Sequence, residues 1–284
     1  MLTKDEKRKV KKEQRRKERG LGGRSAMQAQ QNLSRLEDLI AFDREQMQAD
    51  DFDLVIGVDE VGRGCMAGPV CTAAYALDLK SELFGSEFSA LINFQAHSLE
   101  PLDEEVDEVT QTIETLALLN DSKKVAKSRR DELCNSLRNV DGSLMNIDFR
   151  TAQEIDETSI IACIWKSMRE NFLGILEGRF EEAKVLLLVD GPKVIQDLSS
   201  RGAKGDEALS ITQIPVVRGD SQSFCIAAAS NLAKQARDRY MQEQALKYPG
   251  YGWDTNVGYG TAEHLAAMQK QGLNYEHRRS FSWK

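Results

Sequence analysis

Long apolar runs are missing from this chain of 284 residues. A helix that spans a membrane needs about 20 consecutive apolar residues, and no segment approaches that length. The N-terminal segment is highly charged and lacks the apolar stretch of a secretory signal, so we expect no signal peptide. These absences predict a cytoplasmic protein that is not embedded in a membrane.

Cysteine is scarce and shows no metal-binding spacing. The cysteines are odd in number, and no two of them form a Cys-x-x-Cys pair. This pattern argues against a zinc ribbon and gives no indication of a disulfide framework. We therefore expect free thiols in a reducing compartment. The five cysteines are Cys65, Cys71, Cys134, Cys163 and Cys225.

The net charge of −7 is unevenly distributed. Residues 1–24 contain eleven lysines or arginines against four acids, so the rest of the chain is strongly acidic. A segment this polar cannot bury enough apolar surface to fold, and we predict a basic, disordered tail. Three interpretations stay open: a solubilising tail, a nuclear-localisation-like cluster, or nonspecific attraction to phosphates that weakens as salt rises.

Strand and helix patterns alternate along the rest of the chain. Strands are predicted at 54–58, 69–77, 185–189 and 214–217. Helices are predicted at 25–50, 124–137, 158–172 and 223–246. The first two strands flank a glycine-rich turn, which indicates a hairpin. Residues 81–118, rich in acids, and residues 197–212 are predicted to be insertions.

Acidic side chains follow three of the predicted strands. They are Asp59 with Glu60, then Asp190, then Asp220. Each acid alone is more simply a polar boundary residue or a helix N-cap. Four carboxylates that meet at one sheet edge would repel each other unless a cation lay between them, and oxygen ligands suit Mg²⁺ or Mn²⁺. Two such ions can activate a water and stabilise the leaving oxygen at a phosphodiester.

Two further motifs each allow two interpretations. The turn Gly62-Arg63-Gly64 is either a hairpin that needs glycine for positive φ or a backbone that a ligand approaches closely. In Asp121-Ser122-Lys123-Lys124, the first two residues can cap a helix. Lysines in a first helical turn oppose the helix dipole, which phosphate binding by Lys123 and Lys124 would explain.

Several of these motifs resemble bacterial ribonuclease HII, in the same order along the chain. The resemblance covers residues 54–281 apart from the two insertions. It rests on Gly57-Val58-Asp59-Glu60-Val61-Gly62-Arg63-Gly64, Ala67-Gly68-Pro69-Val70, Asp121-Ser122-Lys123-Lys124, Val189-Asp190-Gly191, Gly219-Asp220-Ser221 with the helix after it, Gly258-Tyr259-Gly260-Thr261 with His264, and His277-Arg278 with Ser280-Phe281.

This resemblance implies an α/β protein with the RNase H-like fold, a central mixed β-sheet flanked by helices. The catalytic domain would cover 51–247, and 248–284 would form a helical C-terminal part that binds substrate. The implied enzyme hydrolyses the RNA strand of RNA–DNA hybrids and nicks duplex DNA 5′ of embedded ribonucleotides, leaving 5′-phosphate and 3′-hydroxyl ends. Its roles would be ribonucleotide excision repair and primer removal, and we expect a monomer.

The resemblance also implies roles for individual residues. Asp59, Glu60, Asp190 and Asp220 would be the catalytic acids and hold Mg²⁺ or Mn²⁺. Gly62, Arg63 and Gly64 would read the ribonucleotide 2′-hydroxyl, a group that DNA lacks. Tyr259 would stack on the sugar beyond it, and Lys123 and Lys124 would hold the backbone. Asp238 is expected to be structural, paired with Arg237 or a loop amide.

The chain departs from the family pattern at a few positions. Cys65-Met66 stands where Pro-Leu is usual, and Pro192 stands where Asn is usual. The rival hypotheses are another RNase H-like nuclease, of the resolvase or integrase type, and a noncatalytic nucleic-acid-binding protein that acts through its basic tail.

Overall fold

The computed structural model describes most of the chain between residues 27 and 282. The described residues are 27–79, 108–119, 125–177, 180, 182–196, 198 and 209–282. The predicted basic tail, Lys123, Lys124 and most of both predicted insertions lie outside these residues.

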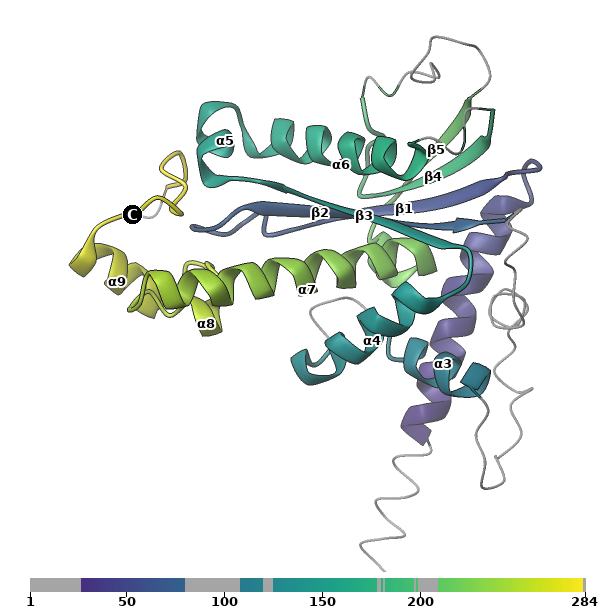
Figure 1. Ribbon diagram of the computed structural model, residues 1–284, viewed down its shortest axis with the longest axis horizontal. Coiled ribbons are helices and arrows are strands. Elements are labelled where there is room, and N and C mark those ends of the chain that lie inside the picture. The colour runs from purple at the N-terminus through teal and green to yellow at the C-terminus, as the bar shows by residue number, and fades with distance from the viewer. Residues whose placement is uncertain are drawn as a thin grey trace, which may run out of the picture.

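A five-stranded mixed sheet forms the centre of the molecule (Figure 1). The strand order is β3-β2-β1-β4-β5, in which β1 pairs antiparallel with β2 and parallel with β4. The predicted hairpin is therefore present, and Pro215 lies in the edge strand β5, where a missing amide is tolerated. The strands are β1 (Leu54–Val61), β2 (Val70–Asp78), β3 (Ser143–Arg150), β4 (Lys184–Asp190) and β5 (Ser210–Val216).

One face of the sheet is covered by α5 (Ala152–Glu157) and α6 (Ile160–Leu176). Thr151 and Glu154 form a capping box at the start of α5, and Ser159 caps α6. The apolar side of α6, including Met168 and Phe172, packs on the alternate residues of the central strands. The caps and the apolar stripe thus explain where these helices begin and which face they bury.

The opposite face carries the long helix α7 (Phe224–Lys247), with α3 (Glu108–Leu116) and α4 (Lys127–Asn139) outside it. The first half of α7 is rich in alanine, so it can lie very close to the sheet. A Cβ on Gly57 of β1 would stand only 2.2 Å from the Cys225 carbonyl carbon. Glycine at this position is therefore what lets α7 pack directly over β1.

A helix over residues 27–47 packs against the same side of the molecule. Its Asp43 is 3% exposed, and Oδ2 of Asp43 accepts a 2.9 Å hydrogen bond from the backbone N–H of Cys225. Burial raises the pKa of Asp43 to about 6. The side chain thereby connects this helix to the N-terminus of α7, where unpaired amides favour a carboxylate.

The C-terminal part contains α8 (Trp253–Asn256) and α9 (Ala262–Gln271) beside the far end of α7 (Figure 1). Trp253 is fully buried, and its ring stacks on Tyr251 with centroids 5.0 Å apart. The indole N–H of Trp253 donates to Nε2 of His264. None of the helices in the described part of the chain is long and apolar enough to cross a membrane.

The structure corrects several sequence predictions. Strand β3 was not predicted, although apolar and polar residues alternate in it from Met145 to Arg150. Residues 210–212 belong to β5 and are not part of an insertion. Asp59 and Glu60 lie inside β1 rather than after its end, because pairing with β2 continues to Val61.

Candidate metal centre and substrate pocket

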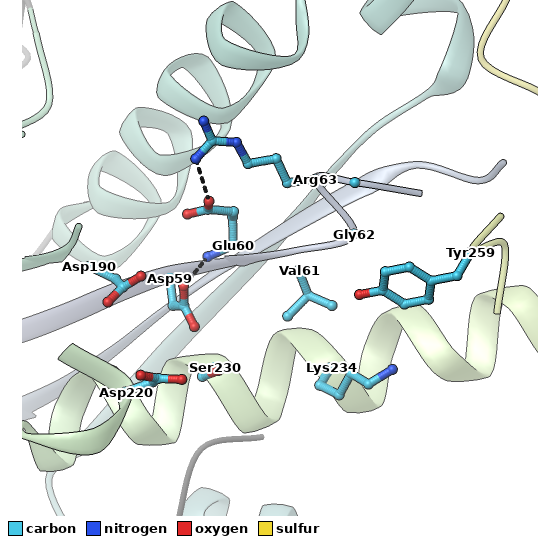
Figure 2. Close-up of a pocket in the computed structure, with 11 residues that line it drawn as sticks. Asp59, Glu60, Val61, Gly62, Arg63, Asp190, Asp220, Ser230, Lys234 and Tyr259 are labelled. Carbon is cyan, nitrogen blue, oxygen red and sulfur yellow. Dashed lines mark hydrogen bonds and ion pairs between the residues drawn. The ribbon is translucent and has the colours of Figure 1, made fainter. Parts of the chain in front are cut away.

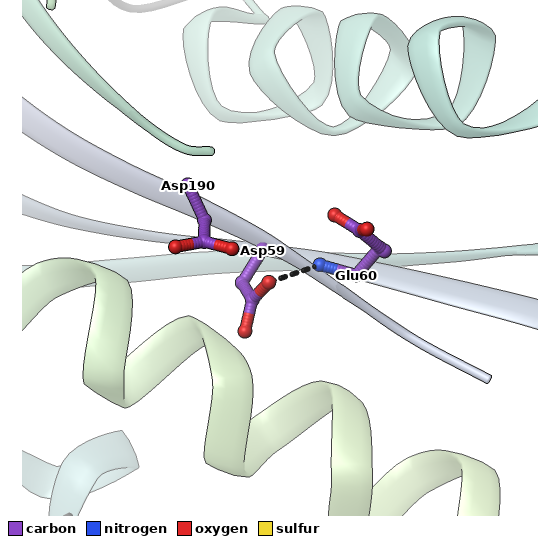
Figure 3. A group of neighbouring side chains, drawn as sticks. All are labelled: Asp59, Glu60 and Asp190. Atoms are coloured by element: carbon purple, nitrogen blue, oxygen red, sulfur yellow. Dashed lines mark hydrogen bonds between the residues drawn. The ribbon is translucent and has the colours of Figure 1, made fainter. Parts of the chain in front are cut away.

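Parallel pairing of β1 with β4 brings the first acids together. Val58 is paired with Val189 in the parallel register. The next residue of each strand, Asp59 in β1 and Asp190 in β4, therefore lies beside the other at the same edge of the sheet. Ligand oxygens of Asp59, Glu60 and Asp190 lie within 4.8 Å of one another (Figure 3). This cluster is the one group of potential metal ligands among the described residues.

Asp59 and Glu60 project to opposite sides because neighbouring residues of a strand alternate. Oδ1 of Asp59 nevertheless accepts a 2.6 Å hydrogen bond from the Glu60 backbone N–H, which fixes the carboxylate beside the strand. The guanidinium of Arg63 lies 3.6 Å from Oε1 of Glu60 (Figure 2). Glu60 thus has one cationic neighbour on the solvent side of the cluster.

Asp220 reaches the same pocket from the short 3₁₀ helix Gly219–Ser221, between β5 and α7. Arg218 turns the chain there with a φ of 56°, in the left-handed region. The backbone N–H of Gly219 then donates a 2.7 Å hydrogen bond to Oδ1 of Asp190. The backbone next to Asp220, the fourth predicted acid, is therefore hydrogen-bonded to Asp190, the third.

The acids strongly perturb each other. Burial raises the pKa of Asp59 well above its usual value, and the charges of Asp190 and Glu60 raise it further. Burial and the charge of Asp190 raise the pKa of Glu60 to about 7. The pKa of Asp190 is also raised by burial, although amides of the adjoining turn oppose the change. Burial raises the pKa of all three acids, and repulsion between like charges adds to the shift at Asp59 and Glu60.

This donor set fits a hard divalent cation. All of the clustered ligands are carboxylate oxygens, and the described residues around them add no histidine or cysteine to the cluster. Mg²⁺ and Mn²⁺ prefer such ligands, whereas zinc sites are built mainly from nitrogen and sulfur. A cation at this position would also offset the repulsion that raises the pKa values of Asp59 and Glu60.

The acids form one end of a cavity of about 260 Å³ (Figure 2). Its walls come from the β1–β2 turn, the end of β4, α7 and the loop before α9. The lining residues are Asp59, Glu60, Val61, Gly62, Arg63, Gly64, Asp190, Asp220, Ser230, Lys234 and Tyr259. The cavity therefore collects every sequence-predicted site residue that the structure describes.

The two glycines of the turn differ in what the protein requires of them. Gly62 has a φ of +91°, and a Cβ there would stand 2.2 Å from Nε of Arg237. Gly64 has no positive φ, and a Cβ there would meet no atom within 4 Å. The fold therefore requires glycine at residue 62, whereas the space beside Gly64 opens toward the cavity.

Tyr259 closes the other end of the cavity, with its ring directed toward the glycine turn (Figure 2). The side chain is 38% exposed, so one side of the ring remains accessible. Its backbone carbonyl is hydrogen-bonded to Nδ1 of His264, 2.9 Å away. A cavity of about 260 Å³ leaves room for a ligand larger than a single ion.

Sequence reasoning missed two polar residues of this cavity, Ser230 and Lys234, besides the apolar Val61. They are four residues apart on α7, so they share one face of the helix. This four-residue spacing, in the helix that follows the predicted fourth acid, is the sequence feature that could have indicated them. Lys234 adds a cation to a cavity that otherwise carries mainly carboxylates.

Asp238 is paired differently from the prediction. Its carboxylate binds Arg130 at 3.2 Å and Lys234 at 2.5 Å, while Arg237 points to backbone carbonyls instead. The structural role expected for Asp238 agrees with this position outside the cavity. The prediction that Arg237 would be its partner was wrong, because adjacent residues of a helix face different directions.

Comparison with known proteins identifies the family. A family model described as ribonuclease HII matches residues 106–284. Ribonuclease HII of Shouchella clausii is 32% identical over 252 residues, which cover 89% of this chain and 77% of that protein. Ribonuclease HII of a Jannaschia species is 34% identical over 229 residues, 81% of this chain and 89% of that protein.

Solved structures with a similar fold include archaeal and bacterial relatives. The ribonuclease HII in the PCNA complex from Archaeoglobus fulgidus gives a TM-score of 0.52 at 21% identity, covering 81% of this chain and 96% of that one. Bst-RNase HIII in complex with Mn²⁺ gives a TM-score of 0.52 at 13% identity, covering 81% and 67%. These likenesses confirm the predicted RNase H-like fold. Together with the family model and the curated relatives, they show that this chain belongs to the ribonuclease HII family.

Proposed function

We propose that this chain is a metal-dependent endonuclease that hydrolyses the RNA strand of RNA–DNA hybrids and nicks duplex DNA on the 5′ side of embedded ribonucleotides. Membership of the ribonuclease HII family supports the reaction class. The observation that carries the proposal is the cavity that joins three clustered carboxylates and Asp220 to an open glycine turn. Ribonucleotide excision repair and primer removal would use this reaction.

Asp59, Glu60, Asp190 and Asp220 would hold two Mg²⁺ or Mn²⁺ ions. When bound, such ions supply an activated water and stabilisation of the departing 3′ oxygen, which leaves 5′-phosphate and 3′-hydroxyl ends. The chain contributes the fixed placement of its carboxylates. The strand holds Asp59, and the Gly219 amide holds Asp190, so the cluster is preorganised before any ligand enters.

The glycine turn and Tyr259 would select the ribonucleotide. A 2′-hydroxyl can both donate and accept a hydrogen bond, so a backbone that approaches it closely can distinguish RNA from DNA. The free space beside Gly64 allows such an approach. The exposed side of the Tyr259 ring can stack on the next sugar, while Arg63 and Lys234 attract the phosphates.

A basic tail, Lys123 and Lys124 would add backbone affinity more than specificity. The acting species would be a monomer in the cytoplasm. Its partner would be RNA–DNA hybrid or ribonucleotide-containing duplex DNA.

The decisive experiment uses a DNA duplex with one ribonucleotide and either Mg²⁺ or Mn²⁺. We expect a nick on the 5′ side of the ribonucleotide, little turnover by Asp190→Asn, and a smaller, salt-dependent loss when residues 1–24 are deleted. Equally fast cleavage of an all-DNA junction would instead favour a resolvase or integrase type. Full function of Asp190→Asn together with loss on tail deletion would favour a noncatalytic binding protein.

A further inference from the structure

Two arginines that do not line the cavity are buried behind its second end, which is formed by the glycine turn and Tyr259. Arg237 of α7 is 0% exposed and Arg278 near the C-terminus is 1% exposed. No carboxylate among the described residues lies within ion-pair distance of either guanidinium. A buried cation without an anion is unfavourable, so these side chains require another explanation.

Both guanidinium groups bind backbone carbonyls of the loops that line the cavity. Arg278 donates to the carbonyls of Arg63 at 3.0 Å and Gly68 at 2.9 Å. Arg237 donates to the carbonyls of Pro69 at 2.8 Å, Ala67 at 3.0 Å and Val257 at 2.9 Å. The planar fork of arginine can hold several such oxygens at fixed angles, which a lysine cannot do.

These contacts join the glycine turn to the loop that carries Tyr259. The backbone amides of Met66 and Ala67 also donate to the Gly258 carbonyl, at 2.8 and 3.2 Å. Val257 has a φ of 44°, which is costly for a β-branched residue and persists only when its surroundings hold it. Its carbonyl is one of those that Arg237 binds.

The contact of Arg278 with the Arg63 carbonyl also fixes the next amide. The described chain contains no cis peptide bond, so the Arg63 carbonyl and the Gly64 N–H point in opposite directions from one planar unit. With the carbonyl directed at Arg278, the Gly64 N–H is directed away from it. Gly64 lines the cavity, and within the described residues this N–H has no acceptor.

We infer that Arg278 is a positioning residue for ribonucleotide recognition, because it orients the peptide unit between Arg63 and Gly64 so that the Gly64 N–H is presented to the 2′-oxygen of the substrate. This inference rests on the proposed function. The Phe281 ring, 5.2 Å from the guanidinium carbon, also contacts this cation. Burial lowers the pKa of Arg278 to about 10, so it stays charged at neutral pH.

The test compares dissociation constants for two duplexes that differ only in one 2′-hydroxyl. Both are measured in an Asp190→Asn background, so that the substrate is not consumed. The quantity of interest is the ratio of the all-DNA to the ribonucleotide dissociation constant. Arg278→Lys is expected to lower this ratio about three- to tenfold, the value of one well-placed hydrogen bond. A merely structural role would weaken binding of both duplexes equally and leave the ratio unchanged.

Arg138→Lys is the matched control. Arg138 is a partly buried arginine that bonds the Cys134 carbonyl and Gln235, away from the cavity. Its substitution should leave the ratio unchanged. If Arg278→Lys does not fold, Phe281→Leu takes its place in the test. This variant removes the ring beside the guanidinium but keeps the arginine, so we expect a smaller fall of the same ratio.

The outcomes separate the two proposals. A ratio that Arg278→Lys and Phe281→Leu leave within twofold of the parent overturns the inference while the proposed function stands. A parent that binds both duplexes equally overturns 2′-hydroxyl recognition by this cavity, and the inference fails with it.

Discussion

The backbone amide of Gly219 donates a 2.7 Å hydrogen bond to Oδ1 of Asp190, and this contact connects the acid at the end of β4 to the short 3₁₀ helix that carries Asp220. Asp220 follows Gly219 directly, so its position depends on the end of β4. The turn is therefore part of the candidate metal centre even though glycine has no side chain that could bind an ion.

Substitution of Gly219 by alanine should disturb this connection. A Cβ there would stand 2.5 Å from Cδ1 of Ile226 and 3.2 Å from Oδ1 of Asp190, so the turn must shift. We expect ribonucleotide cleavage to fall at least about tenfold and Mn²⁺ affinity to fall with it, because ligand placement is lost. Ser221→Ala, in the same turn but exposed, is the control. Wild-type cleavage by Gly219→Ala would show that the turn tolerates movement.

The two glycines of the β1–β2 turn should separate stability from activity. Gly62→Ala places a methyl group against Arg237 at a φ of +91°, and should lower the free energy of unfolding by about 1–3 kcal/mol. Gly64→Ala meets nothing in the protein, so its stability should stay near wild type while cleavage at a single ribonucleotide is lost. Urea unfolding and the nicking assay measure both. An active Gly64→Ala enzyme would contradict close approach at this residue.

Mn²⁺ should stabilise the protein through the acid cluster. Binding to the folded state alone raises the melting temperature, by several degrees when Mn²⁺ is well above its dissociation constant. Without metal, Asp59→Asn should be at least as stable as wild type, because it removes a buried charge that Asp190 and Glu60 repel. Its melting temperature should rise less than that of wild type when Mn²⁺ is added. Thermal melts in EDTA and in Mn²⁺ test this expectation. Asp254→Asn, an exposed acid of α8, should respond like wild type.

The C-terminal histidines should make stability depend on pH. Burial and the neighbouring His264 lower the pKa of His277 to about 4. Between about pH 6.5 and pH 4 the unfolded chain binds the proton and the folded chain does not. The contribution of His277 is therefore complete above pH 6.5 and is lost as the pH falls toward 4, by up to about 1.4 kcal/mol per pH unit.

Comparison with His277→Gln isolates this effect from the raised pKa values of the buried acids, which act in the opposite direction. The difference in unfolding free energy between wild type and variant should stay constant from pH 7.5 to about pH 6.5 and shrink from there to pH 4.5. A difference that stays constant over this range would show that His277 does not titrate between its folded and unfolded states.

Local patterns in the sequence predict most of this fold. Apolar runs bounded by glycine or acids locate four of the five strands, and serine caps with apolar spacing locate α6 and α7 within a few residues. Strand β3 was missed although Met145, Ile147 and Phe149 alternate with polar residues, which is the two-residue period of a strand. Its place comes from pairing with β2, a long-range contact that no local window contains.

The candidate site likewise contains residues that the sequence predicts and residues that it does not. The acids and the glycine turn are recognisable because each follows a strand in a characteristic order. Ser230 and Lys234 depend on which face of α7 meets the sheet, and the partner of Asp238 depends on where α4 packs. Four of the five carbonyls that Arg237 and Arg278 bind lie about 170–215 positions away along the chain, a relation that residue types alone do not encode.

The order of these residues along the chain also determines when the cavity can form during synthesis. The cavity joins Asp59 of β1 to Asp220 and Tyr259, which come much later in the chain, and Arg278, which binds the Arg63 carbonyl, comes later still. Because synthesis proceeds from the N-terminus, the first acids are made long before the residues that complete the cavity around them. The arrangement of the acids therefore cannot be reached by local folding of the first strands and has to wait for the later elements.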